Sequence, residues 1–276
     1  MSPNTARILF DGHVHLYPDY DWALALRTLF TNLGPNGIRL GFLTESAGCR
    51  FYQAACENPS AFVRDGIAVD SGPGPNALTV TSTGSVLGIL IAGRQIVTSE
   101  RLEVLAIGTD ASLPDGQPVD RTLDVVRERG GMPVLSWSPG KWFSARGRLI
   151  ENLITSLPPG CFLLGDTALR PTCWPMPRLM QMARDRGIKI IGGSDPLPLR
   201  HEERQLGTYG ISAMTAYDPL APADSVRRML SYSNTIFTSI GKRSSPLSFA
   251  KRWISNQFRS RPSSAGTPPF DETSAL

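Results

Sequence analysis

The chain has few of the patterns that mark the common membrane, secreted and nucleotide-dependent proteins. Its longest apolar run, near Val86–Ala92, is far too short to span a bilayer. The chain starts with Met-Ser-Pro-Asn-Thr-Ala-Arg, which lacks the apolar core and cleavage site of a signal peptide, so we expect a cytoplasmic protein. It contains no GxSxG nucleophile elbow, dinucleotide fingerprint or P-loop. These absences narrow the enzyme classes that remain open.

Cysteine is also scarce, and its spacing carries no site. The four cysteines are scattered and include no CxxC pair: Cys49, Cys56, Cys161 and Cys173. This spacing fits neither a structural zinc site nor a disulfide framework. Cys173 has no identifiable base partner nearby in the sequence, which a nucleophilic thiol needs. We therefore expect small, buried cysteines in a reducing compartment.

An excess of positive charge is confined to one end of the chain. Residues 241–276 hold six basic and two acidic side chains, whereas the preceding 240 residues hold 22 of each sign. The net charge of +4 therefore comes from the tail. A neutral core gives no electrostatic footprint of nucleic-acid binding, so we expect no nucleic-acid partner.

Strands and helices alternate along much of the chain, which is typical of an α/β fold with a parallel sheet. Helices are predicted over Trp22–Asn32, Phe51–Val63, Val119–Arg129, Gly147–Ser156, Trp174–Arg186 and Ala223–Tyr232. Strands are predicted over Ile8–His15, Ile38–Thr44, Met132–Trp137, Cys161–Gly165 and Ile188–Gly192. Between Gly66 and Gly108, short β-rich runs predict an antiparallel extension. We expect residues 1–240 to form one barrel domain and residues 241–276 a basic tail.

The tail begins with a basic amphipathic segment, Pro246–Phe258, for which we predict a helix. A last helix packed on the barrel is the favoured interpretation, and a helix that contacts a membrane surface or docks a partner is the lesser alternative. From Arg259 onward the chain is rich in Ser and Pro and has no hydrophobic periodicity, which is typical of disorder.

Two of the three histidines lie in one predicted strand, in the run Asp11-Gly12-His13-Val14-His15. Side chains alternate between the faces of a strand, so Asp11, His13 and His15 are expected on one side. Two imidazoles and a carboxylate are suitable ligands for Zn, Mn or Fe. This is the strongest functional signal in the sequence.

Further polar residues follow other predicted strands, where reactive groups gather in parallel α/β barrels. Glu45, Asp166 and Asp195 follow three of these strands, and barrel closure would bring them towards the histidines. We predict a divalent metal held by His13, His15, Asp195 and Glu45. Glu45 and Asp195 are the catalytic candidates. The cations expected to bind an anionic substrate are Lys141 and Arg170.

The pattern Asp11-Gly12-His13-Val14-His15, with Thr44-Glu45 and the late Gly192-Gly193-Ser194-Asp195, resembles the polymerase-and-histidinol-phosphatase (PHP) family. The resemblance extends from about Ile8 to Gly210. It implies a distorted seven-stranded (β/α) barrel and a metal-dependent phosphoesterase activity.

Several positions depart from the family pattern. The residues standing at expected ligand positions are Ser46, Gln95, Ser138 and Leu197. With so few ligands, a cluster of three ions is not expected: the resemblance implies one ion, or two with a loosely occupied second site. His201, six residues after Asp195, is either a compensating ligand or a surface residue.

Three functions remain open at this point. The first is a metal-dependent hydrolase of PHP type, acting on a small phosphorylated or anionic substrate with a metal-activated water. The second is a degenerate barrel that binds or regulates without catalysis, as the missing ligands suggest. The third is an amidohydrolase-like enzyme that cleaves a C–N bond.

Overall fold

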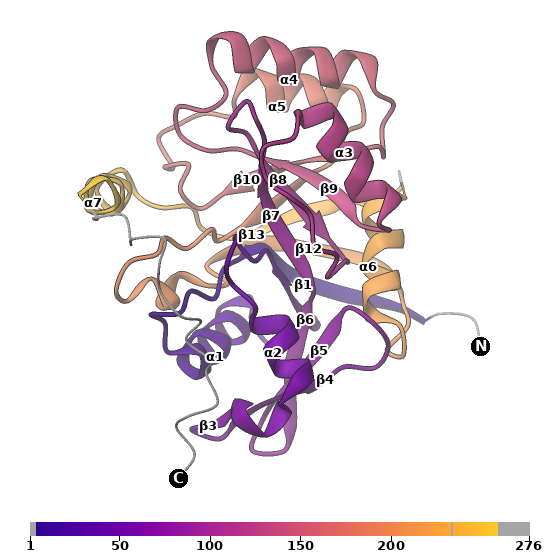
Figure 1. Cartoon of the computed structure of the whole chain (residues 1–276), viewed down its shortest axis with the longest axis vertical. Helices are drawn as coiled ribbons and strands as arrows, with labels where there is room; N and C mark the ends of the chain where they lie inside the picture. Colours follow the sequence, from indigo (N-terminus) through magenta and orange to yellow (C-terminus); the bar gives the residue numbers. More distant parts are fainter. Residues whose placement is uncertain (1–3, 233, 259–276) are drawn as a thin grey trace.

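The computed structural model describes residues 4–232 and 234–258, and their strands form two sheets (Figure 1). The larger sheet has the order β13 (Phe237–Gly241), β12 (Tyr209–Tyr217), β1 (Asn4–Val14), β2 (Ile38–Leu43), β6 (Ser85–Ile91), β5 (Ala77–Ser82), β4 (Ile67–Ser71), β3 (Val63–Arg64). The smaller sheet has the order β11 (Ile190–Gly193), β10 (Leu163–Thr167), β9 (Met132–Ser136), β8 (Glu103–Ile107), β7 (Gly93–Val97).

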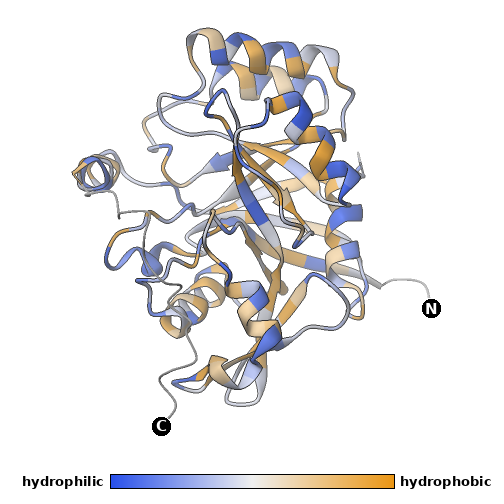
Figure 2. Cartoon of the chain, in the orientation of Figure 1, coloured by the Kyte–Doolittle hydropathy of each residue, from blue (hydrophilic) through white to orange (hydrophobic). Residues whose placement is uncertain are grey.

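Helices cover the outer faces of both sheets. The helices α1 (Trp22–Leu33) and α2 (Phe51–Glu57) pack on the larger sheet, and α3 (Val119–Glu128), α4 (Ser144–Ser156) and α5 (Arg178–Asp185) pack on the smaller one. A third apolar cluster fills the space between the sheets, where α6 (Pro222–Ser231) also packs. Figure 2 shows the apolar strands enclosed by helices whose outer faces are hydrophilic. Burial of these apolar faces is the main term that stabilises the fold.

The two sheets meet along two seams. At one seam the Glu45 N–H donates to the Gly93 carbonyl and the Gln95 N–H donates to the Glu45 carbonyl. At the other, the Asp195 N–H donates to the His13 carbonyl at 3.0 Å. Strand β12 pairs with β1 only as far as Phe10. The carboxyl end of β1 is thereby left to lie beside β11.

A mixed α/β fold is therefore present, but the expected closed barrel is not shown by the described residues. Their strands remain in two sheets because each seam has only isolated backbone bonds rather than a ladder. The antiparallel extension is present as β4, β5 and β6, and β6 then runs parallel to β2. The periodicity missed β12 and β13, which pair antiparallel at the outer edge of β1.

Proline residues shorten one predicted helix. The segment Trp174–Arg186 was expected to be helical throughout, but α5 begins only at Arg178, after Pro175 and Pro177. The residue before a proline is disfavoured in the helical conformation, so the helix starts after the second proline.

The tail begins with the predicted helix, α7 (Pro246–Gln257), which protrudes from the body of the protein (Figure 1). Its buried contact is ionic. Arg252 donates from Nε and Nη2 to the two Glu202 carboxylate oxygens at 2.8 and 2.6 Å, and we call this pair the Glu202–Arg252 clasp. The apolar side chains Leu247, Ile254 and Phe258 are exposed instead. The disorder expected from residue 259 onward lies outside the described residues. Among the described residues, no helix is both long and apolar enough to cross a bilayer.

Candidate metal centre

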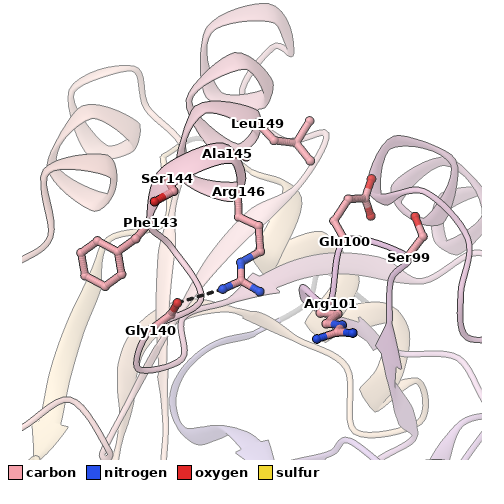
Figure 3. Close-up of a pocket in the computed structure, with 9 residues that line it drawn as sticks. All are labelled: Ser99, Glu100, Arg101, Gly140, Phe143, Ser144, Ala145, Arg146 and Leu149. Carbon is pink, nitrogen blue, oxygen red and sulfur yellow. Dashed lines mark hydrogen bonds between the residues drawn. The ribbon is translucent and has the colours of Figure 1, made fainter.

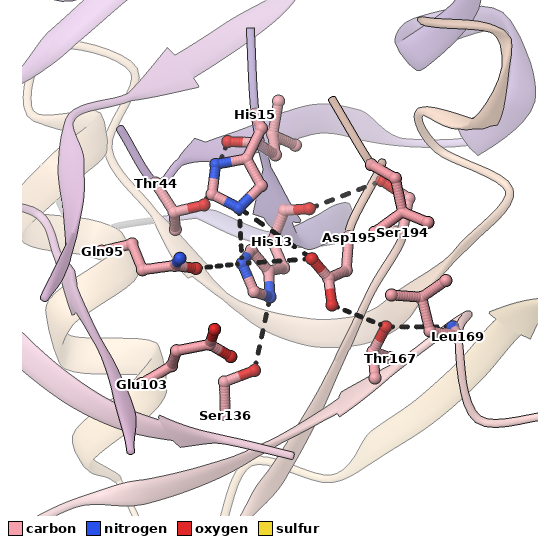
Figure 4. A network of polar contacts seen from close by, with 12 residues as sticks. His13, His15, Thr44, Gln95, Glu103, Ser136, Thr167, Leu169, Ser194 and Asp195 are labelled. Carbon is pink, nitrogen blue, oxygen red and sulfur yellow. Dashed lines mark hydrogen bonds and ion pairs between the residues drawn. The ribbon is translucent and has the colours of Figure 1, made fainter. Parts of the chain in front are cut away.

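His13, His15 and Asp195 converge at the carboxyl ends of β1 and β11 (Figure 4). The two Nε2 atoms lie 2.9 Å apart, and Asp195 Oδ1 lies 3.6 Å from His13 Nε2 and 3.9 Å from His15 Nε2. The histidines are 3% and 2% exposed, and Asp195 is 9% exposed. Three donor atoms thus point into one small, buried volume.

The backbone around this cluster is packed closely enough to fix its geometry. Gly193 lies against His13, where an added Cβ would come within 2.4 Å of His13 Cβ and 2.5 Å of its backbone nitrogen. Asp195 has a φ of 47°, in the left-handed region that non-glycine residues rarely adopt. Strain of this kind is concentrated at functional sites, where the surrounding structure maintains it.

Asp11 lies on the same strand as the histidines, but its carboxylate has a different role. Oδ1 accepts hydrogen bonds from the N–H groups of His13 and Ser194, and Oδ2 accepts one from the Gly207 N–H at 2.8 Å. Asp11 therefore joins β1 to the segments after β11 and before β12. This corrects the expectation that its carboxylate belongs to the ligand set, because its oxygens are engaged by backbone donors.

A histidine binds a metal ion through its neutral imidazole, and the site favours that form of His15. Burial and the neighbouring His13 hold the pKa of His15 well below its usual range. Burial raises the pKa of Asp195, while the His13 imidazole beside it opposes that rise. The three side chains offer two imidazole nitrogens and one buried carboxylate oxygen to a common point. The donor set thus fits a divalent cation of the Zn, Mn or Fe class.

Polar residues on three other strands surround the cluster. Gln95 Oε1 on β7 lies 3.0 Å from His13 Nε2, and Ser136 Oγ on β9 lies 3.5 Å from His13 Nδ1. Thr167 Oγ1 on β10 donates to Asp195 Oδ2 at 3.1 Å. The sequence pattern named Gln95 only as a departure and did not predict the contacts of Ser136 and Thr167. Their positions at the carboxyl ends of β9 and β10 were the available signal.

Glu45 is buried near this region, but its carboxylate faces elsewhere. Oε1 accepts hydrogen bonds from the Phe51 and Tyr52 N–H groups at the amino end of α2. Burial raises the pKa of Glu45 to about 7, and these two backbone donors oppose the rise. The structure does not bring this carboxylate into the ligand cluster. It corrects the expected role of Glu45 as a metal ligand or base, because free helix N–H groups bind the carboxylate.

Lys141 forms an ion pair with Glu103, a residue that the sequence pattern did not indicate. Its Nζ is 2.5 Å from Glu103 Oε1, and Glu103 Oε2 accepts a hydrogen bond from Ser138 Oγ at 2.7 Å. Figure 4 shows Glu103 beside His13 and Ser136. Glu103 is close enough to His13 and Asp195 to influence the titration of Asp195. Lys141 thus supplies a partly exposed positive charge at the edge of the site.

Arg170, the second predicted anion-binding residue, forms a buried ion pair with Asp166. Its Nε and Nη2 donate to the two Asp166 oxygens at 2.7 and 2.6 Å, and both side chains are buried. Asp166 Oδ2 also accepts from the Tyr209 hydroxyl at 2.9 Å. This corrects the expected substrate contact, because the guanidinium has no free face towards the cluster.

The third histidine does not join the cluster. The His201 side chain is 78% exposed and lies 3.8 Å from Glu203, so the structure favours the surface interpretation. Leu197, which stands where the family pattern has a histidine, instead accepts a hydrogen bond from the Tyr20 hydroxyl through its carbonyl.

Comparison with known proteins gives fold-level similarity only. No family model and no curated protein matches the chain. Among solved structures, PsfC from Pseudomonas syringae PB-5123 has a TM-score of 0.60 at 18% identity, over 91% of this chain and 98% of that one. At this identity the match shows the fold alone.

Two more distant neighbours have TM-scores below 0.5. One is a two-domain protein from Bacteroides vulgatus containing a predicted PHP-like metal-dependent phosphoesterase, with a TM-score of 0.49 and 16% identity, over 91% of this chain and 70% of that one. A PHP-like protein is thus among the structural neighbours.

The other is the lesion-specific endonuclease Q of Pyrococcus furiosus, with a TM-score of 0.49 and 10% identity, over 85% of this chain and 59% of that one. Another endonuclease Q structure contains a 27-mer duplex with an abasic lesion at its active site. These neighbours correct the expectation that nucleic acid is not a partner. The neutral net charge of residues 1–240 is a poor ground for that exclusion, because the local distribution of charge, rather than its total, governs contact with phosphates.

Proposed function

We propose that the protein is a metal-dependent hydrolase of phosphoesters. The observation that carries this proposal is the buried convergence of His13, His15 and Asp195, whose donor atoms all lie within 4.8 Å of one another. A purely structural role for such a cluster is costly, because three polar side chains are buried there and, among the described residues, no Lys or Arg forms an ion pair with Asp195. The motif and its late aspartate also resemble the PHP family.

The roles of the protein groups follow from their positions. His13 and His15 would hold the ion through Nε2 and Asp195 through Oδ1, and Thr167 would keep the Asp195 carboxylate oriented through Oδ2. A bound divalent cation supplies Lewis-acid activation of water and of a phosphoryl oxygen. Gln95 adds a neutral amide oxygen beside His13. An amide contributes no charge to neutralise a second cation, which supports one ion rather than a cluster.

The proposal of a phosphoester substrate is supported by the positive charge of Lys141. The ammonium is held beside the cluster by Glu103 and remains partly exposed, so it can contact an anion that approaches the metal. The Glu103 carboxylate positions the lysine and would release part of its interaction when an anionic oxygen arrives. Ammonium groups are common phosphate ligands because they bind as point charges.

The first test is the metal content of the purified protein. We expect about one Mn, Fe or Zn ion per chain, lost in H13A and in H15A. The third histidine provides a matched control, because H201A removes an exposed imidazole far from the ligand set and should retain the ion. Equal metal content in all four proteins would overturn the proposed site.

The second test is activity with a panel of substrates, namely phosphomonoesters, phosphodiesters, single- and double-stranded oligonucleotides, and amides. We expect metal-dependent cleavage of a phosphoester, abolished in D195N. Cleavage of amides alone would instead show an amidohydrolase-like enzyme. The panel must include nucleic acids, because endonuclease Q, a structural neighbour, has been seen with a duplex substrate.

A non-catalytic binding protein is the second candidate, and one observation favours it. Gln95, Ser138 and Leu197 stand where the family pattern has metal ligands, so the site has few anionic groups. A protein that loads metal but cleaves no member of the panel would support this candidate.

A further inference from the structure

A second cleft lies at the same end of the smaller sheet as the metal centre (Figure 3). It has a volume of about 590 Å³ and lies between the β7–β8 hairpin and the segment that leads into α4. Its lining includes Ser99, Glu100 and Arg101 from the hairpin, and Gly140, Phe143 and Arg146 from the other wall. The metal-centre residues do not line it.

Both walls of the cleft are continuous with strands that contact His13. The hairpin follows β7, which carries Gln95, and the opposite wall follows β9, which carries Ser136. Lys141 follows Gly140 of the second wall and is paired with Glu103, the first residue of β8. The cleft and the metal centre are thus joined by the same two strands, with Gly140 on the cleft wall directly before Lys141 in the chain.

The charge available in the cleft is positive. Arg101 is exposed, and Arg146 donates from Nη2 only to the neutral Gly140 carbonyl, at 3.0 Å. Within residues 4–232 and 234–258, neither guanidinium forms an ion pair with a carboxylate. Glu100 contributes one negative charge to the lining and is directed to the start of α3, where both of its oxygens accept from the Val119 N–H at 3.1 Å, so the two arginines leave an excess of positive charge.

The backbone is in an unfavourable conformation on both walls of the cleft. Arg101 has a φ of 63° and Ser144, on the other wall, has a φ of 55°. These left-handed conformations are uncommon for residues other than glycine and asparagine. In the hairpin the turn is closed by the Arg101 N–H, which donates to the Thr98 carbonyl at 2.8 Å, and it places an arginine where glycine would be easier to accommodate. Such strain is tolerated at binding sites.

We propose that this cleft is an anion subsite that binds a phosphate of the substrate other than the one hydrolysed. Arg101 and Arg146 donate to its oxygens from opposite walls, as guanidinium groups do in phosphate recognition. The substrate class is therefore a phosphoester that carries a second phosphate, such as a phosphodiester chain with a phosphorylated end. This inference rests on the proposed function for the position of the reacting group, but the anion binding itself does not.

The first experiment measures binding alone. Isothermal titration calorimetry with inorganic tripolyphosphate compares the wild type with R101Q, R146Q and the double variant. We expect each single substitution to weaken binding by about tenfold or more, because each removes a charge-assisted contact. R148Q is the matched control, since Arg148 lies on the same helix but lines a neighbouring groove, and it should bind as the wild type does.

The second experiment measures discrimination between substrates. The ratio of kcat/KM for a dinucleotide with a terminal phosphate to that for the same dinucleotide without it should fall in R101Q/R146Q and remain unchanged in R148Q. Wild-type tripolyphosphate affinity in R101Q/R146Q, or equal weakening in R148Q, would overturn the subsite. If the protein holds no metal and cleaves nothing, the proposed function fails while calorimetry still decides on the subsite.

Discussion

Replacing Arg170 by Met distinguishes a structural ion pair from a substrate contact. The Arg170 guanidinium and the Asp166 carboxylate are both buried and share two hydrogen bonds of 2.7 and 2.6 Å. Removing one partner of such a pair leaves an uncompensated buried charge and costs about 3–5 kcal/mol. Arg170 also donates to the Trp174 carbonyl at 2.8 Å, and that acceptor would lose this donor. We therefore expect R170M to lower the free energy of unfolding by several kcal/mol.

Urea denaturation followed by tryptophan fluorescence measures this change. The double variant D166N/R170M should recover much of the loss, because a buried amide needs no counter-charge. R178M is the control: Arg178 pairs with Glu151 at the surface, where solvent screens the pair, and its removal should leave the unfolding curve nearly unchanged. A wild-type unfolding curve for R170M, together with a raised KM for phosphoesters, would refute the structural role.

Three further predictions concern the metal, the pH dependence and the packing of the site. Removal of the ion by a chelator should lower Tm, and re-addition should restore it. At an ion concentration 1,000 times its Kd, binding should raise the free energy of unfolding by about 4 kcal/mol. Because burial raises the pKa of Glu45 to about 7, the folded state favours its protonated form and the carboxylate destabilises the fold as the pH rises from 4.5 to 7. E45Q should remove this part of the pH dependence, and an unchanged profile would show that Glu45 titrates normally. G193A should lose both metal and stability, because its Cβ would meet His13 at 2.4 Å, whereas G165A, whose Cβ would meet Ser136 at 3.3 Å, should be milder in thermal unfolding and metal content.

The sequence predicted those features whose signal is local. Helical periodicity located α1 and α3 to within one residue at each end, and the spacing of His13 and His15 placed both imidazoles on one face. These features depend on residues that are close in the chain. The helical and strand periods alone are sufficient to indicate them.

Features that depend on distant partners were less accessible. The side chains of Glu45 and Arg170 had the expected chemistry, but their positions are decided by the amino end of α2 and by Asp166. The spacing of four residues between Asp166 and Arg170 was a usable signal for a local pair. Strand β12 had no such signal, because its place beside β1 is fixed by a pairing of residues about 200 positions apart, such as Ala6 with Thr215.

The Glu202–Arg252 clasp has a consequence for how the protein is made. His13 is synthesised early, but its partner Asp195 follows 182 residues later, and the segment after Asp195 gains its ion pair with α7 only when Arg252 has emerged. During translation, β1 must therefore remain available while almost the whole chain is completed. Contacts between such distant segments form slowly. Metal loading is thus expected to be a late event in biogenesis, because the third ligand, Asp195, is synthesised after about two thirds of the chain.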